Sequence, residues 1–99
     1  MSLVQIIESN FQTAVELVEK SLDLCGESDR KVRIMAVTKT HSIDVVSKAI
    51  QAGITLLGEN RVSEGGRKIK ALGRDSAEFH MIGPIHKKEV RQAIRDFQW

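Results

Sequence analysis

The sequence contains little of several features that mark particular classes of protein. Its 99 residues include a single cysteine, Cys25. One thiol can neither close a disulfide within the chain nor build a metal cluster, so a reducing, cytoplasmic compartment is expected. Residues 1–10 lack the basic segment and apolar run of a signal peptide, and no apolar run approaches the roughly 18 residues of a membrane span. We therefore expect neither secretion nor insertion into a membrane.

The excess of positive over negative charge is also small. Fifteen Lys and Arg residues against 13 Asp and Glu residues leave a net charge of +2, which falls short of the field of a dedicated nucleic-acid binder or a polybasic anchor. Tyrosine is absent and aromatic residues make up only 4% of the chain, so nucleic-acid bases would find few side chains to stack on. A nucleic-acid partner is therefore not expected, and the charge balance points to no other partner.

The remaining composition is that of an ordinary globular protein, with 41% hydrophobic and 28% charged residues. A chain of this length forms at most one domain with a modest core. Residues 3–25 repeat an apolar side chain every three or four positions, which predicts an amphipathic helix. Gly26 follows, and glycine favours the backbone conformation found just past a helix end.

Three pairs of strand and helix are predicted after this first helix. The strands are expected over residues 32–37, 54–57 and 78–82, and the helices over residues 42–53, 60–72 and 89–97. Ser42 and Asn60 are expected to cap the first two of these helices. The first of these strands, at residues 32–37, shows little polar alternation, which is typical of a parallel strand covered on both faces. The pattern is that of an α/β protein with one leading helix followed by three βα units.

Such a sheet is unfinished by itself. Three parallel strands leave two open edges, and the chain falls short of the roughly 250 residues of a closed (β/α)8 barrel. In parallel α/β folds the functional site lies where the strands end, because the loops and the helix N-termini meet there. Three polar loops qualify, formed by residues 38–41, 58–60 and 83–86.

Lys39 is the first candidate in these loops. It continues the alternation of Met35 and Val37 along the strand and would bring its amine to the mouth of the sheet. A desolvated lysine amine, or one beside another cation, can form a Schiff base with an aldehyde. The alternative is a lysine at a strand end that reaches into water, and the position alone leaves both interpretations open.

The other polar residues near the strand ends also have structural interpretations. Glu59 and Asn60 lie between Gly58 and a helix start, so Asn60 fits an N-cap better than a ligand contact on position alone. His80 shares a strand face with Ile82, where a histidine is usually a hydrogen-bonded packing residue. The histidines show no metal-ligand spacing, and no Ser-His-Asp order, P-loop or dinucleotide-binding motif occurs. No metal site is expected.

Three blocks of sequence resemble the pyridoxal phosphate homeostasis protein family, a single-domain relative of the alanine racemase N-terminal barrel. The blocks are Ala36-Val37-Thr38-Lys39-Thr40, then Leu57-Gly58-Glu59-Asn60-Arg61-Val62 with Glu64, and finally Phe79-His80-Met81-Ile82-Gly83. They follow one another in the family's order and at fitting spacing. The resemblance implies that residues 1–99 are the N-terminal portion of a (β/α)8 TIM barrel domain, which is incomplete by itself.

The same resemblance implies a cofactor, pyridoxal 5'-phosphate. Lys39 matches the lysine that holds this cofactor as a Schiff base. The other matching positions are Asn60, which lines the cofactor pocket, Gly58 and Glu59, which shape its turn, and His80 and Ile82, which lie beneath it. Members of the family maintain the cellular supply of the cofactor without an established catalytic turnover. We therefore expect a carrier or regulator, with no catalytic residue.

The chain departs from the family pattern in two respects. After Gly83 the family usually continues His-Leu-Gln, whereas this chain has Pro84, Ile85 and His86. The family's phosphate-binding loops come from the last strands of the barrel, which lie outside these 99 residues. Backbone N–H groups at helix N-termini normally supply much of the affinity for a phosphate. We therefore expect this stretch to bind the cofactor poorly by itself.

Two other functions remain open. A racemase or decarboxylase of the same barrel superfamily would need an added acid/base residue and usually a second domain. A complete length of roughly 220 to 240 residues would favour the single-domain carrier instead. A small RNA-binding module would use a basic group made of His86, Lys87, Lys88, Arg91 and Arg95, although such a group is more often a solvated face.

Overall fold

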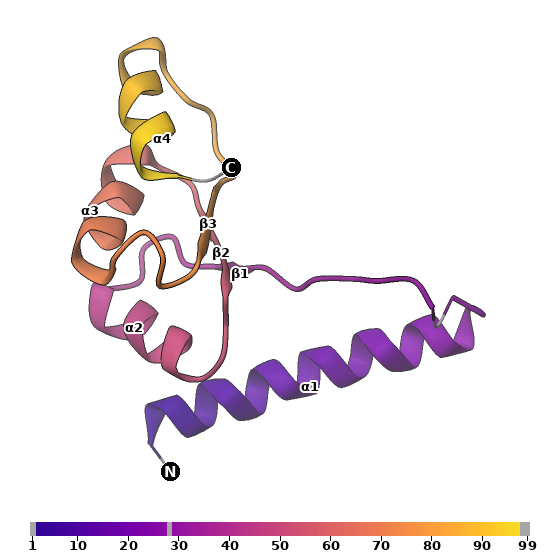
Figure 1. Cartoon of the computed structure of the whole chain (residues 1–99). Helices are drawn as coiled ribbons and strands as arrows, with labels where there is room; N and C mark the ends of the chain where they lie inside the picture. Colours follow the sequence, from indigo (N-terminus) through magenta and orange to yellow (C-terminus); the bar gives the residue numbers. More distant parts are fainter. Residues whose placement is uncertain (1, 28, 98–99) are drawn as a thin grey trace.

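The computed structural model describes residues 2–27 and 29–97. Its elements are α1 (Leu3–Leu24), β1 (Ala36–Val37), α2 (Ile43–Gln51), β2 (Leu56–Glu59), α3 (Val62–Leu72), β3 (Glu78–Met81) and α4 (Val90–Asp96), with a 3-10 turn at Lys87–Glu89 before α4. The strands are parallel and lie side by side in the order β1-β2-β3. The predicted α/β pattern of a leading helix and three strand–helix units is therefore confirmed (Figure 1).

Local sequence explains several of the helix ends. Ser2 starts α1 with a capping box, in which its hydroxyl accepts the Gln5 N–H and the Gln5 side chain accepts the Ser2 N–H. Ser42 caps α2 as predicted, because its hydroxyl accepts the Val45 N–H at 3.2 Å. Gly26 has a φ of 72° just past the end of α1, as predicted.

The start of α3 corrects the prediction that Asn60 caps this helix. The N-cap is Arg61, and its side chain makes no capping hydrogen bond. The carbonyl of Asn60 lies instead against the backbone of Gly83, so closely that a Cβ atom on residue 83 would overlap the carbonyl oxygen. We infer that packing against the chain that leaves β3 delays the helix start by one residue.

Two strands differ from their predicted ranges. β1 covers only Ala36–Val37 rather than residues 32–37. Ala36 pairs with Leu57 and β2 begins at Leu56, so residues 32–34 lie before the start of their partner strand. β2 begins two residues later than predicted. The backbone N–H of Ile54 still bonds to the Ala49 carbonyl at the end of α2, at 3.1 Å, so residue 54 belongs to the helix exit.

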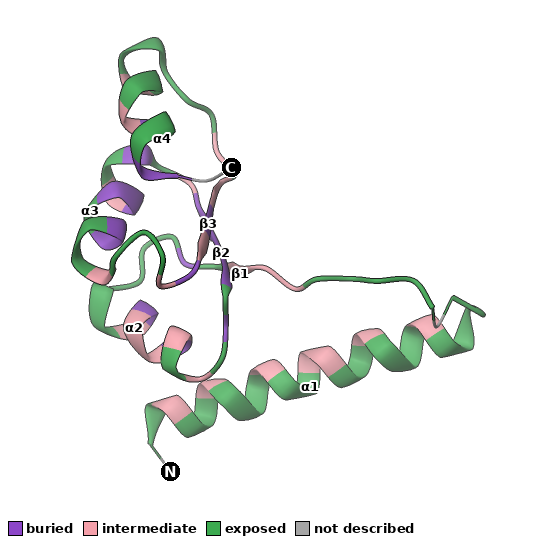
Figure 2. Cartoon of the chain, viewed as in Figure 1, coloured by how far each residue is buried: buried purple, intermediate pink, exposed green. Residues whose placement is uncertain are grey.

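The two faces of the sheet have different surroundings, which corrects the prediction that both are covered. α2, α3 and α4 all lie on one side of the strands (Figure 1). Leu57 and Phe79 point toward these helices and are 0% and 1% exposed, whereas Val37 and Ile82 on the other face are 47% and 46% exposed. The core therefore lies between the sheet and this helix layer (Figure 2). We call the other side the open face; it carries Met35, Val37, Gly58, His80 and Ile82.

Two glycines let α3 approach its neighbours. Gly65 and Gly66 each cost about 1 kcal/mol of helix propensity relative to alanine, yet both are buried within α3. A Cβ atom on residue 65 would lie 2.5 Å from the ring of Phe97 and 3.0 Å from the Cβ of Glu59. The close packing that the glycines permit offsets their low helix propensity.

The apolar stripes of α1 and α4 are less buried than the sequence predicts. In α4, Ala93 is buried, but Val90 and Ile94 are 44% and 72% exposed. α1 has no buried residue, and Ile7 and Phe11 from its first half pack against the core. The rest of α1 continues past the sheet (Figure 1). This raises the radius of gyration to 15.1 Å, above the roughly 13 Å of a compact chain of this length.

Candidate functional site

Five of the six predicted cofactor-binding residues belong to two neighbouring rows of the open face. These residues are Lys39, Gly58, Asn60, His80 and Ile82. The strand register pairs Val37 with Gly58 and Gly58 with His80, which makes one row across the three strands. The second row lies past the C-terminal ends of the strands, where Asn60 follows β2, Ile82 follows β3 and Lys39 lies two residues after β1.

Two backbone hydrogen bonds mark the last paired residues of the strands. The Thr38 N–H donates to the Gly58 carbonyl at 3.0 Å, and the Ile82 N–H donates to the Glu59 carbonyl at 2.9 Å. Thr38 is buried toward the helix layer, at 6% exposure, and Lys39 after it is exposed. The alternation of Val37 and Thr38 predicts the side of the open face for Lys39, which lies in the turn that follows β1.

Small residues bring the strand ends close together. A Cβ atom on Gly58 would lie 2.6 Å from the Sδ of Met35 and 3.1 Å from the Cδ1 of Ile82. Met35 and Ile82 therefore meet over Gly58. Beyond the strands, Gly83 allows the chain to touch the Asn60 carbonyl. The structure thus brings Gly58, Asn60 and Ile82 together, as the motifs predicted.

His80 lies in the lower row and is oriented by a charged pair. Its Nε2 lies 2.9 Å from the Oε1 of Glu78, and Arg33 donates two hydrogen bonds to the same carboxylate, at 2.7 Å and 3.3 Å. The Arg33 guanidinium, followed by His80, lowers the pKa of Glu78 to about 2. Glu78 is therefore ionised at neutral pH and fixes the ring of His80. The prediction of a hydrogen-bonded strand histidine is confirmed.

Glu59 is the predicted site residue that lies elsewhere. Because side chains alternate along a strand, Glu59 points to the opposite face from Gly58 and Asn60. Its side chain lies in the helix layer and is 0% exposed. Its carboxylate oxygens lie 3.0 Å and 3.1 Å from the Nζ of Lys68 in α3, and they accept a hydrogen bond from the Thr38 hydroxyl. A buried carboxylate needs such partners, because an unpaired buried charge is costly. Glu59 therefore lies on the helix side of the sheet, away from the open face.

Lys68 connects this buried pair to the loop after β1. Its ammonium donates to the Thr38 carbonyl at 2.6 Å and to the Oε1 of Glu64 at 3.1 Å. The same Glu64 oxygen accepts the Thr40 N–H at 2.6 Å. The hydrogen bonds from Lys68 and then from Thr40 lower the pKa of Glu64 below its ordinary value. Both residues next to Lys39 are thus bonded to side chains of α3.

Thr40 has an unusual backbone conformation. Its φ is 67°, and it is the one residue other than glycine with a positive φ in the described part of the chain. The left-handed region costs an L-residue about 1–2 kcal/mol, and for a β-branched residue it is a genuine outlier. The bond to Glu64 holds this conformation, together with a turn in which the His41 N–H donates to the Thr38 carbonyl at 3.1 Å.

Sequence reasoning missed Lys68. Two signals pointed to it. The first is that Glu64 and Lys68 are four residues apart on a helix with the acidic residue first, which is a favourable pairing. Glu59 shares its alternation with Leu57, which predicts that both face the helices. Neither signal says that the lysine is 3% exposed, because its burial depends on how α3 packs on β2.

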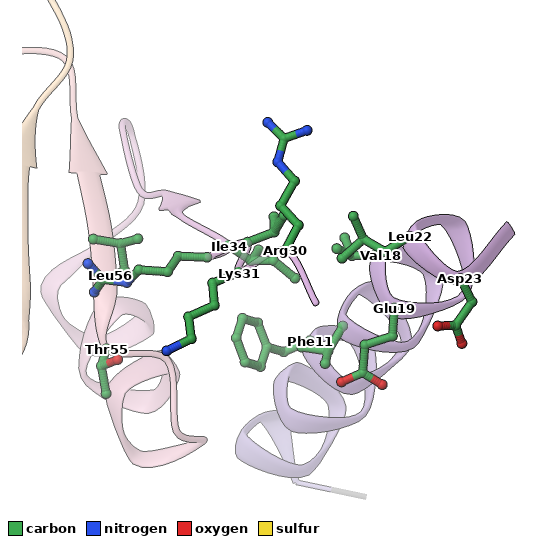
Figure 3. Close-up of a pocket in the computed structure, with 13 residues that line it drawn as sticks. Phe11, Val18, Glu19, Leu22, Asp23, Arg30, Lys31, Ile34, Thr55 and Leu56 are labelled. Carbon is green, nitrogen blue, oxygen red and sulfur yellow. The ribbon is translucent and has the colours of Figure 1, made fainter. Parts of the chain in front are cut away.

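A separate cavity of about 640 Å³ lies between α1, residues 30–34 and the start of β2 (Figure 3). Phe11, Ile34 and Leu56 contribute to its apolar lining, and Lys31 extends along it. This cavity is at the N-terminal end of the strands, and functional sites of parallel α/β folds lie at the opposite end. The incompletely buried stripe of α1 accounts for it.

The rows at the strand ends offer one distinctive chemistry, that of a primary amine accessible to a carbonyl compound. In the part of the chain that the structure describes, no three His, Cys, Asp or Glu residues are grouped so that they could hold a metal ion. No described helix combines the length and apolar character needed to cross a membrane.

Comparison of sequences finds several curated relatives named pyridoxal phosphate homeostasis protein. The chain is 31% identical over 97 residues to the pyridoxal phosphate homeostasis protein of Vibrio cholerae, which covers 94% of this chain and 41% of that protein. It is 34% identical over 96 residues to the protein of that name from Haemophilus influenzae, covering 91% of this chain and 40% of the relative. The chain thus spans about two fifths of the length of these relatives. No family profile matches the chain.

Comparison of structures agrees. PipY of Synechococcus elongatus, solved with PLP bound, matches with a TM-score of 0.66 and 29% identity over 82% of this chain and 39% of PipY. An unknown protein from Bifidobacterium adolescentis matches with a TM-score of 0.79 over 96% of this chain and 43% of its own. Its sequence identity of 24% supports the fold alone.

Proposed function

Because the chain belongs to the pyridoxal phosphate homeostasis protein family and corresponds to its N-terminal portion, we propose that it binds pyridoxal 5'-phosphate through a Schiff base on Lys39. The proposed role is to maintain the supply of this cofactor inside the cell, without catalytic turnover. The observation that carries the proposal is an exposed lysine in the turn after β1, at the end of the sheet where Asn60 and Ile82 follow β2 and β3. Gly58 and His80 form the floor, and Glu59 supports the turn from behind.

The residues present fit the aldehyde end of this cofactor. A Schiff base needs an accessible primary amine, and the side chain of Lys39 is exposed. Close packing at Gly58 and Gly83 lets the neighbouring strand ends meet beside it. The imidazole of His80 is fixed by Glu78 in the row beneath. When bound, the cofactor supplies an aldehyde that reacts reversibly with amines, which suits a carrier.

We infer that the open face is part of the inner wall of a (β/α)8 barrel. Its apolar residues Val37 and Ile82 are nearly half exposed. Apolar side chains on a sheet usually pack against a further layer. The helices on the other side correspond to the outer ring of such a barrel. In this arrangement the later strands of the family would supply the groups that bind the phosphate.

The carrier is favoured over a racemase or decarboxylase by the curated relatives. Their name refers to homeostasis of the cofactor and not to a reaction. Since 97 residues make up 41% of the Vibrio cholerae protein, that protein has roughly 240 residues, close to the lower end of barrel sizes. This leaves little length for a second domain.

The proposal is tested by titrating the chain with pyridoxal 5'-phosphate and following the visible absorption of the Schiff base. Lys39→Arg keeps the positive charge but cannot form this bond, so most of the absorption at low cofactor excess should disappear. Lys31→Arg is the matched control, because Lys31 lines the cavity at the other end of the strands. Equal absorption from both variants would contradict the assignment of Lys39.

A further inference from the structure

The chain on both sides of Lys39 is held by α3. On one side, the Nζ of Lys68 lies 2.6 Å from the Thr38 carbonyl oxygen. On the other side, the Thr40 N–H donates to Glu64 at 2.6 Å. Lys68 and Glu64 are also bonded to each other, at 3.1 Å. The two contacts therefore belong to one connected group that reaches Lys39 from behind the sheet.

The centre of this group has little freedom to move. The side chain of Lys68 is 4% exposed, and that of its partner Glu59 is 1% exposed. An ammonium group has three hydrogens to donate, and acceptors from Thr38, Glu59 and Glu64 surround this one. Any rotation of the Lys68 side chain would break a bond in a place where water could not replace it.

The loop itself would not keep its conformation without these contacts. Thr40 has a φ of 67°, a region that β-branched residues rarely adopt. A strained conformation of this kind persists only when the surroundings enforce it. The bond from Thr40 to Glu64 is the contact that enforces it from α3.

We propose that Lys68 and Glu64 are positioning residues for the amine of Lys39. They bond to its two neighbours and so fix the backbone from which the lysine side chain starts, while they touch no cofactor themselves. This inference rests on the proposed function of Lys39 and adds the cause of its placement. A displacement of about 1 Å in a reacting group can reduce a rate by roughly a hundredfold. Loss of the contacts from Lys68 and Glu64 should therefore change the reactivity of Lys39 measurably.

Two variants of Glu64 separate positioning from charge. Glu64→Gln removes the charge but keeps a carbonyl oxygen that can accept the Thr40 N–H. Glu64→Ala removes both. The side chain of Glu64 is the more exposed member of the pair, at 22%. Glu64→Ala leaves Lys68 with the Thr38 carbonyl and both Glu59 oxygens as acceptors, and circular dichroism checks that both variants remain folded.

The readouts are amide hydrogen exchange at Thr40 and the rate at which pyridoxal 5'-phosphate with borohydride labels Lys39. Labelling of Lys31 in the same samples is the internal reference. We expect Glu64→Ala to speed exchange at Thr40 and to slow labelling of Lys39 about tenfold relative to Lys31. Glu64→Gln should keep most of the slow exchange at Thr40 and most of the labelling rate of Lys39. If the negative charge of Glu64 were what mattered, this variant would behave like Glu64→Ala.

The outcomes distinguish the two proposals. If the wild-type chain labels Lys39 and Lys31 equally, the proposed function of Lys39 fails, whatever the exchange data show. If the wild-type chain prefers Lys39 and Glu64→Ala keeps both that preference and the slow exchange at Thr40, the function stands and the positioning role is wrong. A second pair, Lys68→Met with Glu59→Gln, removes the Thr38 contact without leaving a buried charge and should lower the preference for Lys39 in the same way.

Discussion

The ammonium group of Lys68 lies 2.6 Å from the carbonyl oxygen of Thr38. This bond joins the middle of α3 to the residue immediately before Lys39. A buried lysine requires acceptors of this kind together with a counter-charge, which Glu59 supplies. The inner pair and the exposed amine are therefore parts of one arrangement, built from both sides of the sheet.

Removal of Lys68 alone should strongly destabilise the fold. In Lys68→Met the carboxylate of Glu59 stays buried without its partner, and breaking such a pair costs about 3–5 kcal/mol. The double variant with Glu59→Gln should recover most of this loss, because it leaves no buried charge. Urea denaturation measures the free energy of unfolding of each variant. Losses that simply add in the double variant would contradict the pairing.

The contact between Gly83 and Asn60 predicts a difference between two glycine substitutions. In Gly83→Ala the new methyl would overlap a backbone carbonyl, and crowding of this kind costs about 1–3 kcal/mol. In Gly66→Ala it would meet the ends of the Gln92 and Asp96 side chains, at 2.6 Å and 2.8 Å. Those side chains can move, and alanine regains about 1 kcal/mol of helix propensity.

Thermal unfolding of the two alanine variants is the measurement. We expect a clear fall in melting temperature for Gly83→Ala and little change for Gly66→Ala. An equal fall in both would mean that the backbone of the Asn60 turn yields as easily as a side chain.

The charged pair beneath the site predicts a pH dependence. The pKa of Glu78 is about 2 in the folded chain against 4.5 ordinarily, so its contribution to stability is present above pH 4.5 and is lost as the pH falls toward 2. Arg33 is the largest cause of this shift. In Arg33→Gln the pKa of Glu78 should rise toward its ordinary value, as measured by carboxyl NMR titration. A titration unchanged by the substitution would show that the pair does not form in solution.

Local signals in the sequence predicted much of the fold. Ser42 and Gly26 mark helix ends because capping depends on neighbouring residues only. The alternation of Phe79 and His80 gave the correct faces of β3, since side chains alternate in any strand. The grouping of Gly58 and Ile82 into one candidate site came instead from the resemblance to the family.

Features that depend on distant partners were not predictable in this way. β1 is short because β2 begins late, and no property of residues 32–35 shows where β2 begins. Asparagine is a common N-cap residue, yet the N-cap of α3 is Arg61, and the Asn60 carbonyl packs against Gly83 instead. The burial of Lys68 follows from the packing of α3, and the exposure of Val37 depends on which elements lie over its face of the sheet.

The attachment point of the cofactor tests the central claim most directly. The chain is incubated with pyridoxal 5'-phosphate, reduced with borohydride and digested, and mass spectrometry then measures the modified fraction of each lysine. We predict that a larger fraction of Lys39 than of any other exposed lysine carries the cofactor. Modification spread evenly over the lysines, or found only on others, would contradict the account.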